Sequence, residues 1–138
     1  MWKDYLSSIS VECQFQNPVT KFDLQSVEDN LHVKIPAKVL ELYKETNGVF
    51  GPYGISYFWS TEQMIRENLL ARNSHNNMDN ILFFSDAGNG DLFGYSFVDG
   101  MQQNECIYYW NHEDGSVKII ASSLEEFLKG WILGEISV

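Results

Sequence analysis

The sequence predicts an α+β domain in which helices come first, an antiparallel meander follows, and one more helix ends the chain. Apolar residues recur at helical spacing in much of the first 72 residues, change to a period of about two after residue 80, and return to helical spacing near residue 124. Helices and strands that are segregated in this way are typical of the α+β class. With 138 residues, we expect a single domain over 1–138.

Three helices are expected before residue 50. The first is indicated by apolar side chains at Trp2, Tyr5, Leu6 and Ile9. The second carries its apolar side chains at Leu24, Val27 and Leu31, and Asp23 is placed to cap it. Pro36 opens the third, because the N–H that proline lacks has no partner in the first turn of a helix. Asn47-Gly48 is expected to end it.

A short aromatic strand is expected at 55–59, and a helix follows it directly. Ser60 and Gln63 have the spacing of a capping box, so this helix should begin at Thr61 and run to about Arg72. Its apolar positions are Met64, Leu69 and Leu70. Residues 73–79 are expected to form a polar loop.

Four strands are predicted from alternation and turn chemistry in the second half of the chain. They span residues 81–85, 92–97, 106–110 and 117–121. Short links rich in Gly, Asn and Asp join them, which favours antiparallel neighbours. Ser122 and Ser123 then precede Glu125 and Glu126, in the pattern that starts a last amphipathic helix.

Net charge excludes two classes of partner. The chain has 9 Lys and Arg against 19 Asp and Glu, a formal net charge of −10. Nucleic-acid backbones and anionic lipid surfaces both require clustered basic side chains, so we expect neither as a partner. Residues 73–117 contain no Lys or Arg, and all seven of their charged side chains are acidic. This block predicts a surface that attracts a basic partner, although Asp is also common in turns for structural reasons.

No residue pattern indicates an enzyme or a bound cofactor. The best candidate is Cys106 with His112 and either Glu113 or Asp114, a potential thiolate nucleophile. Alternation instead favours packing for Cys106 and a turn for His112. The three histidines lack metal-ligand spacing, and the Asp86–Asp91 segment places glycines where a calcium loop needs oxygen ligands. We therefore expect a non-enzyme without a metal or cofactor, and a structural role for Asp91.

The compartment is expected to be the cytoplasm. The first residues lack the basic start and apolar run of a signal peptide, and no apolar segment approaches the length of a membrane span. Cys13 and Cys106 form no C-x-x-C pair, which is typical of proteins in a reducing compartment.

Five motifs in order resemble the SUKH superfamily, which includes fungal cell-wall-synthesis regulators and bacterial immunity proteins. They are Ile35-Pro36 with Leu42-Tyr43 and Asn47-Gly48, then Phe58-Trp59-Ser60, Ser85–Asp91, Tyr109–Glu113 and Ala121–Leu128. The resemblance covers about residues 22–132. It implies a curved, mainly antiparallel sheet of about five strands, with the N-terminal helices and the C-terminal helix packed on it.

The resemblance also implies a function in protein binding. Bacterial members often neutralise a cognate toxin, commonly a nuclease encoded by a neighbouring gene. An immunity protein that binds a basic toxin domain is one hypothesis, and a regulatory interaction module without a toxin is the other. The residues predicted to contact the partner are Asp79, Asp86, Asp99, Glu105, Glu113, Asp114 and Tyr109. The oligomeric state is left open.

Overall fold

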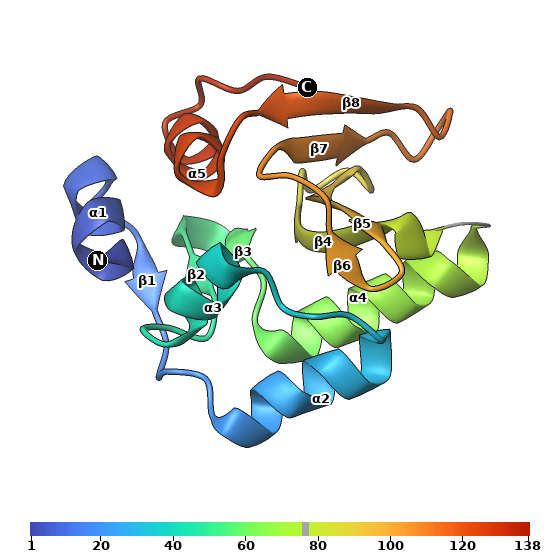
Figure 1. Cartoon of the computed structure of the whole chain (residues 1–138). Helices are drawn as coiled ribbons and strands as arrows, with labels where there is room; N and C mark the ends of the chain where they lie inside the picture. The colour runs from blue at the N-terminus through green and yellow to red at the C-terminus, as the bar shows by residue number, and fades with distance from the viewer. Residues whose placement is uncertain (76–77) are drawn as a thin grey trace.

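The computed structural model describes residues 1–75 and 78–138 as five α-helices and two antiparallel sheets (Figure 1). The helices are α1 (Trp2–Ile9), α2 (Lys21–Leu31), α3 (Ala37–Tyr43), α4 (Thr61–Ser74) and α5 (Leu124–Ile132), and Pro52–Gly54 (η1) and Met78–Asn80 (η2) form 3₁₀ turns. The strands are β1 (Gln14–Phe15), β2 (Val49–Phe50), β3 (Ser56–Phe58), β4 (Ile81–Asp86), β5 (Leu92–Val98), β6 (Met101–Gln102), β7 (Ile107–Trp110) and β8 (Val117–Ala121). The α+β class is confirmed.

The predicted meander forms the larger sheet. Its order is β4-β5-β7-β8, every pairing is antiparallel, and β6 adds a short hairpin to β5. Phe93, Tyr95 and Phe97 share one face of β5, as the alternation predicts, and all three are buried. The four strands expected in this half of the chain are therefore confirmed.

Helices cover both faces of this sheet. On one face, Phe127 of α5 packs against Phe84 and Phe93, with ring centroids 5.6 and 4.7 Å apart. On the other face, α4 lies along β4, and α2 packs on the outside of α4 (Figure 1). Arg72 of α4 also donates to the carbonyl of Leu31, 2.8 Å away, at the end of α2. Burial on both faces explains why residues 81–85 of β4 are all buried.

The buried face of α4 includes an asparagine and leaves out the two leucines that were expected on it. Leu69 and Leu70 are exposed, and the buried face contains Met64, Asn68 and Ala71. Asn68 accepts a hydrogen bond from the N–H of Phe83 at 2.9 Å and donates to its carbonyl at 2.8 Å. One amide side chain therefore satisfies the backbone of β4 as a neighbouring strand would.

The smaller sheet was not predicted. It has the order β1-β2-β3, and two of its strands are only two residues long, too short for alternation to show. The aromatic strand expected at 55–59 is confirmed as β3, but it belongs to this sheet. Its end meets the edge of β4, where the N–H of Trp59 donates to the carbonyl of Phe84 at 2.8 Å. Trp59 is fully buried.

Helix ends follow the sequence with two corrections. Helix α3 ends at Tyr43, before the Asn47-Gly48 pair that was expected to end it. Ser60 and Gln63 form the predicted capping box of α4. For α2 the N-cap is Thr20, and Asp23 is its capping-box partner three residues later. Asp23 was wrongly expected to be the cap. Thr20 and Asp23 both have side chains that can cap a helix, and the extended backbone of Thr20 makes it the residue at which the helix begins. Helix α4 also continues to Ser74, into the expected loop at 73–79, of which residues 76 and 77 lie outside the described residues.

Candidate partner-binding surface

The acidic residues of the meander lie at two opposite ends of the larger sheet. Because β4 and β7 both run antiparallel to β5, turns alternate between the two ends of the strands. One end carries Asp79, Asp99 and Glu105, and the other carries Asp86, Glu113 and Asp114. The seven residues of β5 separate these ends by about 20 Å. The structure thus divides the block that was expected to form one surface.

We call the second end the turn surface, and define it by Asp86, Glu113 and Asp114. Its two turns are tied together by Asp91, which is buried. The Asp91 carboxylate accepts hydrogen bonds from the Tyr109 hydroxyl and from the backbone N–H of His112 at 3.0 Å. It also contacts Nδ1 of His112, and an ionised carboxylate can only accept, so this nitrogen carries the proton.

These hydrogen bonds shift the pKa values of Asp91 and Tyr109. Desolvation raises the pKa of Asp91, but the hydrogen bonds from Tyr109 and His112 outweigh it and lower the pKa to about 2. The hydrogen bond to Asp91 is the largest cause that raises the pKa of Tyr109 to about 12, and burial is the second. Asp91 is therefore ionised under ordinary conditions and holds the β7–β8 turn against the β4–β5 turn, in agreement with the structural role expected of it.

Tyr109, one of the predicted contact residues, offers little surface to a partner. Its side chain is only 6% exposed, and its hydroxyl already donates to Asp91. Gly90 helps to close this arrangement, since its φ is +104° and a Cβ at this position would lie 3.0 Å from the His112 ring. Tyr109 therefore supports the turn surface from the interior, through its hydrogen bond to Asp91.

Glu113 and Asp114 project from a turn that local hydrogen bonds hold in place. Asn111 accepts hydrogen bonds from the backbone N–H groups of Glu113 and Asp114, at 2.8 and 3.4 Å. The Asp114 carboxylate accepts from the N–H of Ser116 at 2.8 Å, and this bond lowers its pKa. Both carboxylates are exposed, and within the described residues neither has a basic side chain within ion-pair distance.

Asp86 lies between two hollows in the surface. Its carboxylate accepts from the indole N–H of Trp59 at 2.8 Å and from the N–H of Gly88 at 2.9 Å. The first hollow, of about 410 Å³, runs between α4 and the two turns. The second, of about 560 Å³, lies between η1 and the end of α5. Among the residues that the structure describes, no Lys or Arg lines either hollow, so Asp86 keeps an uncompensated negative charge at the border of both.

The first hollow combines aromatic and imidazole groups with this charge. His75 packs its ring edge-on against Trp110 at 5.0 Å, and His112 lies on the opposite turn. The exposed Leu70 of α4 forms part of the wall. A partly apolar hollow with the Asp86 carboxylate at its border is suited to a partner that presents a basic side chain beside an apolar one.

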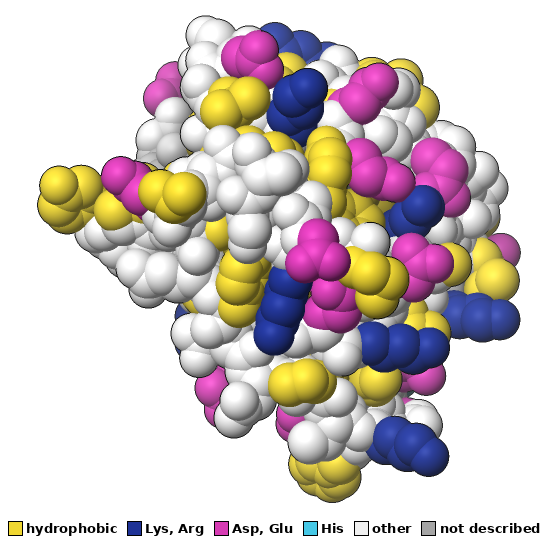
Figure 2. All heavy atoms as spheres, turned by 90° about the vertical axis from the view of Figure 1, so that its left-hand side faces the viewer, with side chains coloured by type: hydrophobic (Ala, Val, Ile, Leu, Met, Phe, Trp, Pro, Cys, Tyr) yellow, Lys and Arg dark blue, Asp and Glu magenta, His cyan; other side chains and the backbone are white. Residues whose placement is uncertain are grey.

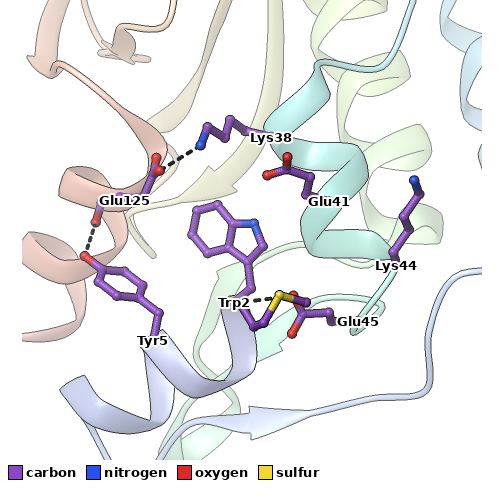
Figure 3. A pocket seen from close by; sticks show the side chains of 8 residues that line it. Trp2, Tyr5, Lys38, Glu41, Lys44, Glu45 and Glu125 are labelled. Atoms are coloured by element: carbon purple, nitrogen blue, oxygen red, sulfur yellow. Dashed lines mark hydrogen bonds and ion pairs between the residues drawn. The ribbon is translucent and has the colours of Figure 1, made fainter.

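A third hollow lies on the other side of the molecule, between α1, α3 and the start of α5 (Figure 3). We call it the N-terminal groove. Its volume is about 540 Å³, and its lining residues are Met1, Trp2, Tyr5, Lys38, Glu41, Lys44, Glu45 and Glu125. On the face that carries α1, basic, acidic and hydrophobic side chains are intermixed (Figure 2). The groove therefore lacks the one-signed charge of the turn surface.

Several polar groups of the N-terminal groove bind one another. The Glu45 carboxylate accepts from the N–H groups of Trp2 and Lys3 at 2.8 and 3.0 Å and so caps α1. Partial desolvation raises the pKa of Glu45, but these two hydrogen bonds and nearby positive charge outweigh it, and its pKa lies below the ordinary value. Across the groove, Lys38 pairs with the carboxylate of Glu125 at 3.0 Å, and Tyr5 donates to the Glu125 carbonyl at 3.0 Å (Figure 3).

The residues of the candidate nucleophilic site do not come together. Cys106 precedes β7 and His112 follows its end, so the four residues of this strand, about 13 Å long, separate them. Among residues 1–75 and 78–138, no group of three His, Cys, Asp or Glu side chains is arranged to hold a metal ion. In the same ranges, every helix is too short or too polar to span a bilayer.

Comparison with known proteins places the chain in a family. No curated protein matches the sequence. The family model SUKH_6, described as SMI1-KNR4 cell-wall, matches residues 22–128. The match begins at α2 and ends within α5, so it includes both turns of the turn surface and leaves α1 outside. The order of motifs along the sequence predicted this relationship, and the match extends over most of the chain. The protein therefore belongs to the SUKH family of SMI1-KNR4 cell-wall domains.

Proposed function

We propose that the protein is an immunity protein that binds a basic toxin domain, of the nuclease class, through the turn surface. The observation that carries the proposal is the group of carboxylates at Asp86, Glu113 and Asp114, which has no basic side chain within ion-pair distance in the described residues. Family membership is consistent with immunity and with SMI1-KNR4-like regulation. The charge favours a basic partner, and a nuclease cleft lined with Lys and Arg is such a partner.

The mechanism is electrostatic capture followed by occlusion. Carboxylates of the turn surface take the place of nucleic-acid phosphates and attract the basic cleft at long range, which raises the association rate. Docking then blocks the cleft in the cytoplasm of the producing cell. The toxin would be encoded beside the gene of this protein.

Matched charge variants at the two ends of the sheet test this mechanism. Glu113→Gln with Asp114→Asn removes two charges from the turn surface, and Asp99→Asn with Glu105→Gln removes two from the opposite end. We expect the first pair to lower the association rate with the neighbouring gene's C-terminal domain about tenfold at low salt, and to flatten its salt dependence. The second pair should change the rate by less than threefold.

Two results would contradict the proposal. Equal effects of the two pairs would mean that only net charge matters and that the turn surface is not the contact. If the purified wild-type protein does not bind the neighbouring product, the toxin partner is wrong and the regulatory interaction module becomes the better interpretation.

A further inference from the structure

A fully exposed tyrosine occupies a backbone conformation that disfavours it. Tyr53 has φ 60° and ψ 29°, in the left-handed region, and its side chain is 100% exposed. L-residues with a bulky side chain rarely adopt this conformation, because Cβ then crowds the backbone, whereas glycine adopts it freely. The Tyr53 hydroxyl makes no hydrogen bond to the residues the structure describes. Packing within the fold therefore does not explain why a large aromatic stands at this position.

Tyr53 stands at the rim of the hollow of about 560 Å³ described above, which we call the Tyr53 groove. The wall nearest Tyr53 includes Ile55, which is 44% exposed, and the opposite wall includes Leu133, which is 48% exposed. Trp131 is half-buried between them and stacks on the core through Phe127. A groove with an exposed aromatic at its rim and exposed aliphatic side chains in its walls is typical of the centre of a protein interface.

The groove carries negative charge. Of the described residues that line it, Asp86 alone has a formal charge. Helix α5 ends in its wall, where the carbonyl end of the helix adds a partial negative charge. The Tyr53 ring is free to receive a cation on its face. Because Asp86 also belongs to the turn surface, the groove and that surface are continuous.

From these observations we infer that the Tyr53 groove anchors a segment of the basic protein partner, in which an apolar side chain enters between Ile55 and Leu133 and a flanking Lys or Arg lies against Tyr53 and Asp86. The inference rests on the proposed function for the basic character of the partner. A second copy of this chain is disfavoured as the occupant, because its net charge of −10 would bring two acidic surfaces together. In this arrangement the turn surface determines how fast the partner is captured, and the Tyr53 groove determines how slowly it leaves.

Binding kinetics distinguish these two roles. The probe is the purified C-terminal domain of the neighbouring gene's product, measured against wild type, Tyr53→Ala and Tyr53→Gly. We expect both variants to raise the dissociation rate at least tenfold, with little change in the association rate or its salt dependence. Phe22→Ala is the matched control, since Phe22 is 81% exposed at the start of α2 and does not line the groove. It should leave both rates unchanged.

Stability measurements on the same variants exclude a merely structural role. Tyr53→Gly removes the left-handed strain, so its urea midpoint should equal or exceed that of wild type while its binding weakens. A fall in both the midpoint and the affinity would show that Tyr53 acts through the fold and would overturn the inference.

The remaining outcomes are also decisive. If Tyr53→Ala binds as wild type while the turn-surface variant loses association rate, the proposed function stands and the Tyr53 groove is not the anchor. If wild type does not bind the probe, the proposed function fails, and a random-peptide display selection on the purified protein decides the inference. Selected peptides with Lys or Arg beside an apolar residue, which bind wild type but not Tyr53→Ala, would support it. Selection without such peptides, or a wild-type dimer that Tyr53→Ala dissociates, would overturn it.

Discussion

The N-terminal groove and the turn surface use acidic side chains in opposite ways. In the groove, Glu45 connects the turn after α3 to the start of α1, and Glu125 of α5 pairs with Lys38 of α3. On the turn surface, Glu113 and Asp114 bind only their own turn and project into solvent. The acidic side chains of this protein therefore have two different roles. The hydrogen bonds and ion pairs that each carboxylate makes, not its residue type, show which role it has.

Asp91 is the sharpest test of this comparison, because it lies among the turns but is used as the groove residues are. Asp91→Asn should lower the free energy of unfolding by about 2–3 kcal/mol, since hydrogen bonds to a charged group are lost and the nearly buried Tyr109 hydroxyl loses its acceptor. Urea unfolding measures this value. Glu113→Gln, on the adjacent turn, is the control and should leave stability unchanged. Equal stability of the two variants would contradict a structural role for Asp91.

The pH dependence of stability gives a second test of the same residue. The pKa of Asp91 is lowered to about 2 in the folded state and is close to 3.9 in an unfolded chain. Its contribution to stability is therefore fully present above about pH 4 and is lost as the pH falls toward 2. Unfolding free energies measured between pH 6 and pH 2 should show this loss in wild type and a shallower decline in Asp91→Asn. Parallel curves would show that other carboxylates govern the acid transition.

A smaller effect is expected in the N-terminal groove. Glu45→Ala should lower the free energy of unfolding by about 1 kcal/mol, the usual value of a lost helix cap, because the N–H groups of Trp2 and Lys3 lose their acceptor. The control is Glu41→Ala, which removes a second glutamate side chain from the same groove. The Glu41 carboxylate makes no hydrogen bond to the described residues. Thermal or urea unfolding of both variants measures the difference. A similar loss in both would mean that groove charge, not capping, stabilises α1.

The sequence predicted the meander, the capping box of α4 and the family, because each depends on residues close together in the chain. It missed Asn68 and Glu45, whose partners are 15 and more than 40 residues away. It also treated the acidic block as one surface, since a linear count of charge does not register that successive hairpin turns alternate between the ends of a sheet. The positive φ of Tyr53 has no sequence signal except the neighbouring Pro52 and Gly54.

The amide of Asn68 has a consequence for how the protein behaves in a crowded solution. By occupying the backbone groups of Phe83, it closes one border of the larger sheet to intruding chains. Among the described residues, the other border, along β8, pairs with no further strand. Lys118 stands exposed near the start of that strand, between Val117 and Ile119, and a charge at this position discourages the strand-on-strand pairing that begins a fibril. Resistance to aggregation in this fold thus depends on an amide at one border and an ammonium group at the other.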